Sequence, residues 1–239
     1  MEDAKSSVGE IDLFTGVQEA DVVHKHIVFR ELSGIEEDVL ASKKMSVSSK
    51  ITRVLANCVQ AFGTIQDRDA VNKMVRKMTI ADRIFYLIQL RILSIGRDIQ
   101  FVDKCPACGN EDKKDFDLNQ VVVKDAPVAT SLLKEILLPS GKKVRIKVAN
   151  GESEEKIEKA TTDDNAATIG LFVRIDSIDD QPPSLVHVKQ MSFKDRNALR
   201  KEIDALEGEL DDTYKTSCPA CGHEYEGDIP INGVDFFFP

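Results

Sequence analysis

Two cysteine motifs have the residue types and the spacing for metal chemistry. The string CPACG occurs at residues 105–109 and again at residues 218–222. Two residues between the thiolates let both sulfurs reach one ion at about 2.3 Å, while proline fixes the turn and glycine accepts the backbone angle that aims amides at the sulfurs. Two motifs then complete a closed, tetrahedral, structural Zn²⁺ site with no position left for a substrate. The predicted ligands are Cys105, Cys108, Cys218 and Cys221.

Two other interpretations of these motifs stay open. They could form redox dithiols of a thioredoxin-like kind, or knuckles that no longer hold metal. Redox catalysis favours a low-pKa thiol at a helix N-terminus after a strand, whereas we expect both motifs to lie between two strands. The fifth cysteine, Cys58, falls within an apolar helical stripe, which predicts a small, buried side chain.

The 109 residues between the inner cysteines of the two motifs far exceed the usual spacing of about 12–20 in a zinc ribbon. An internal repeat explains this gap. The second motif lies 113 positions after the first, and at the same offset Asp82 matches Asp195 and Arg83 matches Arg196. Each copy is predicted to be a capped helix, a short strand with an aromatic residue, a cysteine turn and a departing strand.

Apolar spacing, caps and turn residues predict the elements that must position these motifs. Before the first motif we expect a mobile arm over residues 1–21, a strand over 21–31, a helical stripe from residue 47 that ends near Gly63, a helix over 69–77, and an apolar helix over 80–95 capped by Thr79 and buried on two sides. Between the motifs we expect a hairpin over 134–148, a charged helix over 151–164 and a strand over 184–190. The segment 167–179 fits either helix or strand.

Together these elements predict an α+β fold. It has a helical N-terminal part, a split four-cysteine zinc ribbon built from the internal repeat, and an inserted lobe of β-hairpin and helix. The predicted divisions are residues 1–40 for an N-terminal arm and strand, 41–97 for a helical region, 98–123 plus 191–239 for a helix and the zinc ribbon, and 124–190 for the inserted lobe. We expect an approximate twofold relation between the two halves of the ribbon.

Charge and composition narrow the classes of function. The 239 residues carry a net charge of −9, which disfavours binding to nucleic-acid phosphates. Apolar runs are only a few residues long and the first residues lack a secretory layout, so we expect neither a membrane span nor an export signal. The four histidines are expected on strands or beside an already filled metal shell. Because no catalytic arrangement or phosphate loop stands out, we expect neither an enzyme nor a small-molecule substrate.

Three aromatic residues and a proline close the sequence. Exposing Phe236, Phe237 and Phe238 together is costly, so they are expected to be covered. Either they fold back onto the ribbon, or they bind another subunit as an interface anchor. The second alternative makes these three the predicted partner-binding residues.

Several motifs, taken in order, resemble one family. They are the helix ADRIFYLIQLRILSIG before the first CPACG, the hairpin LLPSGKKVRIKV, the stretch SIDD, the second CPACG and the FFFP end, over residues 78–239. This series is similar to the bacteriophage T4-type baseplate hub assembly chaperones, or baseplate hub subunits, of contractile-tail phages and related injection systems. Ala81 departs from the glycine expected before the Asp-Arg pair.

The resemblance implies a non-enzymatic protein of virion assembly that acts at the central hub of the baseplate. Its partners would be other hub and tail proteins, and its place the host cytoplasm during assembly. Whether it then stays in the virion or leaves as a chaperone is open. The competing function is a zinc ribbon that binds nucleic acid in transcription or replication, which the acidic neighbours GNEDKKDFD and GHEYEGDIP disfavour.

Overall fold

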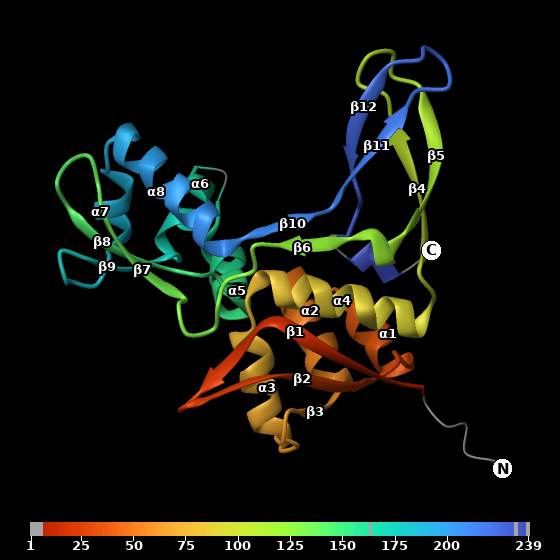
Figure 1. The fold of residues 1–239 in the computed structure, drawn as a ribbon, viewed down its shortest axis with the longest axis horizontal. Coiled ribbons are helices and arrows are strands. Elements are labelled where there is room, and N and C mark those ends of the chain that lie inside the picture. Colours follow the sequence, from red (N-terminus) through yellow and green to blue (C-terminus); the bar gives the residue numbers. More distant parts are fainter. Residues whose placement is uncertain (1–6, 163, 232–233, 238–239) are drawn as a thin grey trace.

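The computed structural model describes residues 7–162, 164–231 and 234–237 (Figure 1). The first half of the chain contains, in order, β1 (Val8–Glu19), β2 (Val22–Arg30), α1 (Gly34–Ala41), α2 (Val47–Cys58), β3 (Val59–Phe62), α3 (Arg68–Lys77), α4 (Ile80–Ser94), β4 (Asp98–Lys104), β5 (Glu111–Asp117), η1 (Leu118–Gln120) and β6 (Val122–Lys124). The second half contains β7 (Leu133–Leu137), β8 (Lys143–Lys147), α5 (Gly151–Ala160), α6 (Ala166–Phe172), β9 (Ile175–Ile178), α7 (Leu185–Lys189), α8 (Phe193–Glu207), β10 (Glu209–Asp211), β11 (Thr213–Ser217), β12 (Glu224–Asp228) and η2 (Val234–Phe237). This mixture of helices and sheets is α+β, as predicted.

The two halves share one order of elements. Each begins with an antiparallel hairpin whose second strand pairs with a later third strand, giving the sheets β1-β2-β3 and β7-β8-β9. Each half then has helices before and after its third strand, and a hairpin that carries a cysteine motif. The repeat recognised in the sequence at the α4 and α8 helices therefore extends upstream to the first strand of each half.

One aspartate ties the long helix of each half to its hairpin. Asp82 on α4 accepts hydrogen bonds from the backbone N–H groups of Thr15, at 3.1 Å, and Gly16, at 2.8 Å. Its repeat equivalent on α8, Asp195, accepts from the N–H of Ser140 at 3.0 Å. A buried carboxylate is stable only with such donors. The repeat therefore preserves this contact between the long helix and the hairpin, as well as the pattern of residues.

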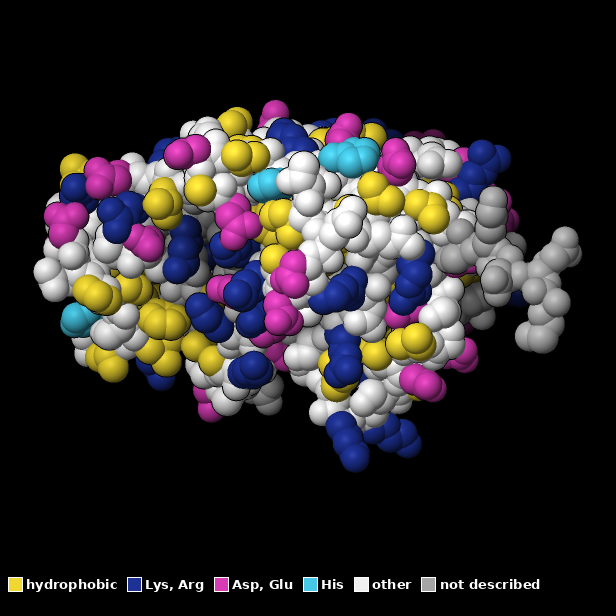
Figure 2. Space-filling view, turned by 90° about the horizontal axis from the view of Figure 1, so that it is seen from below, with side chains coloured by type: hydrophobic (Ala, Val, Ile, Leu, Met, Phe, Trp, Pro, Cys, Tyr) yellow, Lys and Arg dark blue, Asp and Glu magenta, His cyan; other side chains and the backbone are white. Residues whose placement is uncertain are grey.

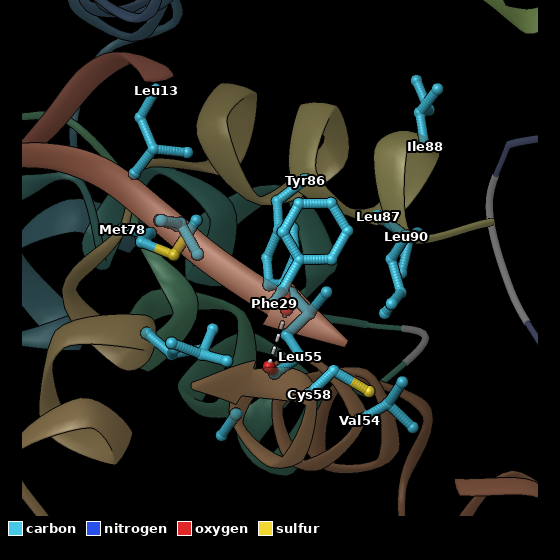
Figure 3. Close-up of a cluster of buried hydrophobic side chains, with 14 of the residues drawn as sticks. Leu13, Phe29, Val54, Leu55, Cys58, Met78, Tyr86, Leu87, Ile88 and Leu90 are labelled. Atoms are coloured by element: carbon cyan, nitrogen blue, oxygen red, sulfur yellow. Dashed lines mark hydrogen bonds between the residues drawn. The ribbon is translucent and has the colours of Figure 1, made fainter. Parts of the chain in front are cut away.

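The larger core lies between the sheet β1-β2-β3 and helices α2, α3 and α4. Phe29 on β2 packs edge to face on Tyr86 of α4, with ring centroids 5.1 Å apart, and the Tyr86 hydroxyl donates to the Leu55 carbonyl at 3.2 Å (Figure 3). Cys58 is fully buried in the same cluster, as predicted. Burial raises the pKa of its thiol to about 12, which disfavours the reactive thiolate form.

A second core fills the space between the sheet β7-β8-β9 and helices α7 and α8. Val144 and Ile146 of β8 meet Val188 of α7 and Leu199 and Ile203 of α8. The segment predicted as an inserted lobe, residues 124–190, therefore shares its core with α8. In Figure 1 this second group of elements lies to the left of the larger core, with α5 at the junction.

The prediction of a mobile arm is wrong for residues 8–19, which form β1. This strand pairs with β2 from Val8 opposite Arg30 onwards, and it buries Leu13 and Val17 in the core. Its register shifts near Gly16, whose positive φ of 79° suits glycine. The acidic residues that made the segment look like an arm lie on the solvent side. Residues 1–6 lie outside the described part of the chain.

Three predicted elements need correction, and one open segment is settled. The helix from residue 47 ends at Cys58 instead of near Gly63, because Arg68 donates to the carbonyls of Ala56 and Val59 and residues 59–62 join the sheet as β3. The segment 184–190 forms α7 instead of a strand, since the Ser184 side chain caps its N-terminus. The segment 167–179 contains both α6 and β9. The predicted helices over 69–77 and 80–95 and the hairpin of 134–148 are confirmed, and the charged helix that begins at Gly151 ends at Ala160 instead of residue 164.

Candidate metal centre

The two CPACG motifs form matching turns at the ends of two hairpins. In the first turn the N–H of Cys105 donates to the Asn110 carbonyl, and in the second the N–H of Cys218 donates to the His223 carbonyl, both at 2.9 Å. The glycine that ends each motif has φ of +73°, a conformation that favours glycine. The first motif lies between β4 and β5, and the second lies between β11 and β12, so both lie between strands as predicted. These hairpins lie side by side at the upper right of Figure 1.

The four predicted ligands come together although two pairs lie far apart in the sequence. The Cys105 and Cys221 sulfurs are 3.8 Å apart, the Cys108 and Cys218 sulfurs are 3.6 Å apart, and all four lie within 4.8 Å of one another. A tetrahedral Zn²⁺ with sulfurs at about 2.3 Å separates neighbouring sulfurs by about 3.8 Å. The spacing of the thiols therefore fits one zinc ion, and it exceeds the length of a disulfide bond, about 2.05 Å.

The electrostatics of the thiols also favour a shared cation. The N–H groups of Cys221 and Ala220 lower the pKa of Cys218 to about 7. At Cys108 the N–H of Asn110 lowers the pKa, but the neighbouring thiols outweigh it and raise the pKa to about 12. Four adjacent thiolates repel one another, so they ionise together only around a positive ion. A metal bound by all four thiols would have no coordination position left for a substrate.

Asp103 joins the two hairpins beside the cysteines. It lies on β4, and its carboxylate accepts hydrogen bonds from the hydroxyls of Tyr214 on β11 and Tyr225 on β12. Lys114 of β5 adds a bond of 2.9 Å to the hydroxyl of Thr216. Sequence reasoning missed Asp103, because nothing in its neighbourhood distinguishes it from the many other acidic residues near the motifs.

A comparison with models of protein families identifies the family of this chain. The model of the family described as T4 bacteriophage base plate protein matches residues 18–239. The chain belongs to this family. The match confirms the resemblance found in the sequence. No curated protein and no solved structure matches the chain.

The remaining chemistry-bearing residues of this base plate protein do not form a second metal site in the described ranges. His26 lies on β2 with its Nδ1 3.0 Å from the Asp12 carboxylate, on the exposed side of the hairpin. His187 lies on helix α7, which corrects the prediction of a strand residue. His223 stacks on Tyr225, with ring centroids 6.2 Å apart, and stays outside the thiol cluster. Every helix in the described residues is too short or too polar to cross a bilayer.

The terminal aromatics of the base plate protein turn inward where they are described. Phe236 and Phe237 are 3% and 4% exposed, and they pack edge to face in the larger core. Arg91 of α4 lies over the Phe236 ring and donates from its Nε to the Phe236 carbonyl at 2.9 Å. This placement favours folding back, with Phe236 held by Arg91 of α4 instead of by the ribbon that we expected. Phe238 lies outside the described residues, and partner binding by the three phenylalanines stays a prediction.

Proposed function

We propose that this base plate protein is a non-enzymatic component of the central hub of a contractile-tail baseplate, either as a hub subunit or as a hub assembly chaperone. The family places it among baseplate proteins, whose work depends on contact with other baseplate proteins. It would act in the host cytoplasm during assembly.

The closed cysteine cluster supports this proposal more than any other feature. In the described residues it is the group with the spacing of a metal site, and all four ligand positions of a zinc ion would be filled by the chain itself. Neither a substrate nor an activated water has a coordination position there. The metal would therefore hold two hairpins together, which suits a protein that presents surfaces to partners.

Purification of tails from an infection with epitope-tagged protein tests the proposal and separates its two forms. A hub subunit stays in finished tails, whereas a chaperone is recovered only with partial hub assemblies. Loss of the protein should stop hub assembly in both cases. Normal hubs without the protein would contradict both forms.

The nucleic-acid alternative has its own test. A ribbon of this type would shift single-stranded DNA at low salt, with binding that weakens steeply as salt rises. The net charge of −9 favours no shift. A shift that disappears in a Cys218→Ser variant would favour the alternative over the hub proposal.

A further inference from the structure

Helix α5 of the second half covers one face of the first half. Arg83 of α4 donates to the Glu154 carboxylate at 2.9 Å, and Arg76 of α3 donates to the Glu155 carboxylate at 2.9 Å. Just before α5, the backbone at residue 149 accepts from the N–H of Ile80. We call Arg76, Ile80 and Arg83 the covered face. Its two arginines bind the acidic pair of α5, and the backbone N–H of Ile80 binds the residue two positions before that helix.

The repeat places an equivalent face on the second half. At the offset of 113, Arg76 corresponds to Lys189 on α7, and Ile80 and Arg83 correspond to Phe193 and Arg196 on α8. We call these three residues the open face: Lys189, Phe193 and Arg196. Both faces therefore combine two cations with one apolar side chain.

The two arginines show that the faces are equivalent in structure: each donates to a threonine hydroxyl, Thr52 or Thr168, and they differ in that Arg83 has a carboxylate partner where Arg196 has the Ala167 carbonyl. Arg83 donates to the Val75 carbonyl at 3.1 Å, and Arg196 donates to the carbonyl of the equivalent Val188 at 3.0 Å. Arg83 also has the Glu154 carboxylate. Across the described ranges no carboxylate pairs with Arg196. The open face thus lacks the acidic group that the covered face receives from α5.

The open face is also accessible. The Phe193 side chain is 74% exposed, and Val186, one turn before Lys189 on α7, is 62% exposed. Figure 2 shows apolar side chains gathered at the left end of the molecule, where the second half lies, next to lysine and arginine side chains. Burial and the nearby Arg200 lower the pKa of Arg196, as expected for a cation without a counterion. Exposed apolar residues beside unpaired cations are typical of an interaction site.

Helix α1 is the counterpart of α5 in the first half. Each helix follows the first hairpin of its half, begins with a glycine after a polar cap, and carries two acidic residues at its fourth and fifth positions. These pairs are Glu37 and Asp38 in α1, and Glu154 and Glu155 in α5. In α1 both acidic residues are exposed, and Ile35 beside them is 64% exposed. The helix that would fit the open face is therefore present on the chain itself, and within the described part of the chain its acidic pair has no side-chain partner.

We propose that the open face binds helix α1 of a second copy of this chain, so that Glu37 and Asp38 meet Arg196 and Lys189. The contact repeats between two chains what α5 and the covered face do within one chain. Because the two surfaces differ, the contact is head-to-tail, and it closes into a ring or extends according to the rotation between copies.

Analytical ultracentrifugation of the full chain over a wide concentration range tests the proposal. Wild-type protein should associate as concentration rises. Arg196→Glu and the double variant Glu37→Lys/Asp38→Lys should each weaken association by at least about tenfold, which corresponds to about 1.4 kcal/mol. An equimolar mixture of Arg196→Glu with the neutral variant Glu37→Gln/Asp38→Asn retains one intact helix and one intact open face. The remaining helix and face carry no opposite charges, so the mixture should form dimers that grow no further.

Matched variants separate the loss of this contact from general effects of charge and of misfolding. Lys215→Glu makes the same charge change on exposed β11, away from both surfaces, and should associate like wild type. The milder pair Glu37→Gln/Asp38→Asn removes the charges with less effect on the start of α1, and circular dichroism confirms folding of each variant. Wild-type chains that stay monomeric at every concentration would overturn the proposal. So would charge-reversed variants that associate as wild type does.

Discussion

Phe101 on β4 and Tyr214 on β11 occupy equivalent positions of the two repeats and pack edge to face, with ring centroids 5.4 Å apart. A residue that contacts its own equivalent lies close to an approximate twofold axis. The sulfur pairs follow the same relation, since the repeat converts the pair Cys105 and Cys221 into the pair Cys218 and Cys108. The duplication therefore explains how the two cysteine pairs meet in one cluster.

Metal content and stability should both depend on the four paired cysteines. Purified protein is expected to contain one zinc ion per chain, and Cys218→Ser should lose the ion and several kcal/mol of stability, because the metal closes a loop of 109 residues between the inner cysteines. Elemental analysis and thermal melting measure the two effects. Cys58→Ala is the control, since this buried thiol lies outside the cluster and its loss should leave the zinc content unchanged. An unchanged melting temperature in Cys218→Ser would refute the prediction.

Gly151→Ala should loosen the contact between the two halves. A Cβ at this position would lie 2.6 Å from Nη1 of buried Arg83 and 3.0 Å from the Arg76 carbonyl. Such overpacking costs about 1–3 kcal/mol, measurable by urea unfolding. Gly170→Ala in α6 is the matched control, because nothing lies within 4 Å of its Cβ, and alanine there should stabilise by about 0.5–1 kcal/mol. Equal effects of the two substitutions would show that the contact is not tight.

Two phenylalanines with opposite exposure test where the terminal aromatics lie. Phe236→Ala should destabilise the chain by about 3–5 kcal/mol, because the ring is buried beneath Arg91. Phe193→Ala removes a ring that is 74% exposed and should change the stability of the monomer by no more than about 0.5 kcal/mol. Urea unfolding at low protein concentration measures both. A stable Phe236→Ala chain that fails to assemble with hub proteins would instead support the partner-binding alternative.

The stability of the first half should fall in acid through Glu36. Although burial opposes ionisation, hydrogen bonds from Arg30 and Ser33 lower the pKa of Glu36 from 4.5 to about 2. Because the pKa is depressed in the folded state, the contribution is complete above about pH 4.5 and is lost as the pH falls towards 2. Urea unfolding at a series of pH values should show a smaller acid-induced loss for Glu36→Gln than for wild type. Parallel curves for the two proteins would contradict this prediction.

Local signals in the sequence were sufficient for the best-predicted elements. The cap at Thr79 and the apolar spacing after it predicted α4, and Pro139 with Gly141 predicted the turn between β7 and β8. The cysteine motifs predicted their own turns and their ligand roles, because two residues between thiols is a property of a few adjacent positions. The offset of 113 predicted that the two motifs meet, and the sulfur distances agree with that prediction.

Long-range contacts decided the elements that the sequence misjudged. β1 looks polar alone and becomes a strand because β2 lies beside it and α4 covers Leu13 and Val17. β3 breaks an apolar helical stripe because pairing with β2 and the two bonds from Arg68 outweigh its helical spacing.

The sequence by itself determined the family, the repeat and the four cysteines that cluster, since these depend on residue identity and on a constant offset. Only the tertiary structure decided that α5 covers Arg83 and leaves its repeat equivalent, Arg196, uncovered. It also placed Phe236 inside the core and Asp103 between two tyrosines. The physical reason is that burial and charge pairing depend on which distant parts of the chain come into contact. A local pattern of residues does not specify those contacts.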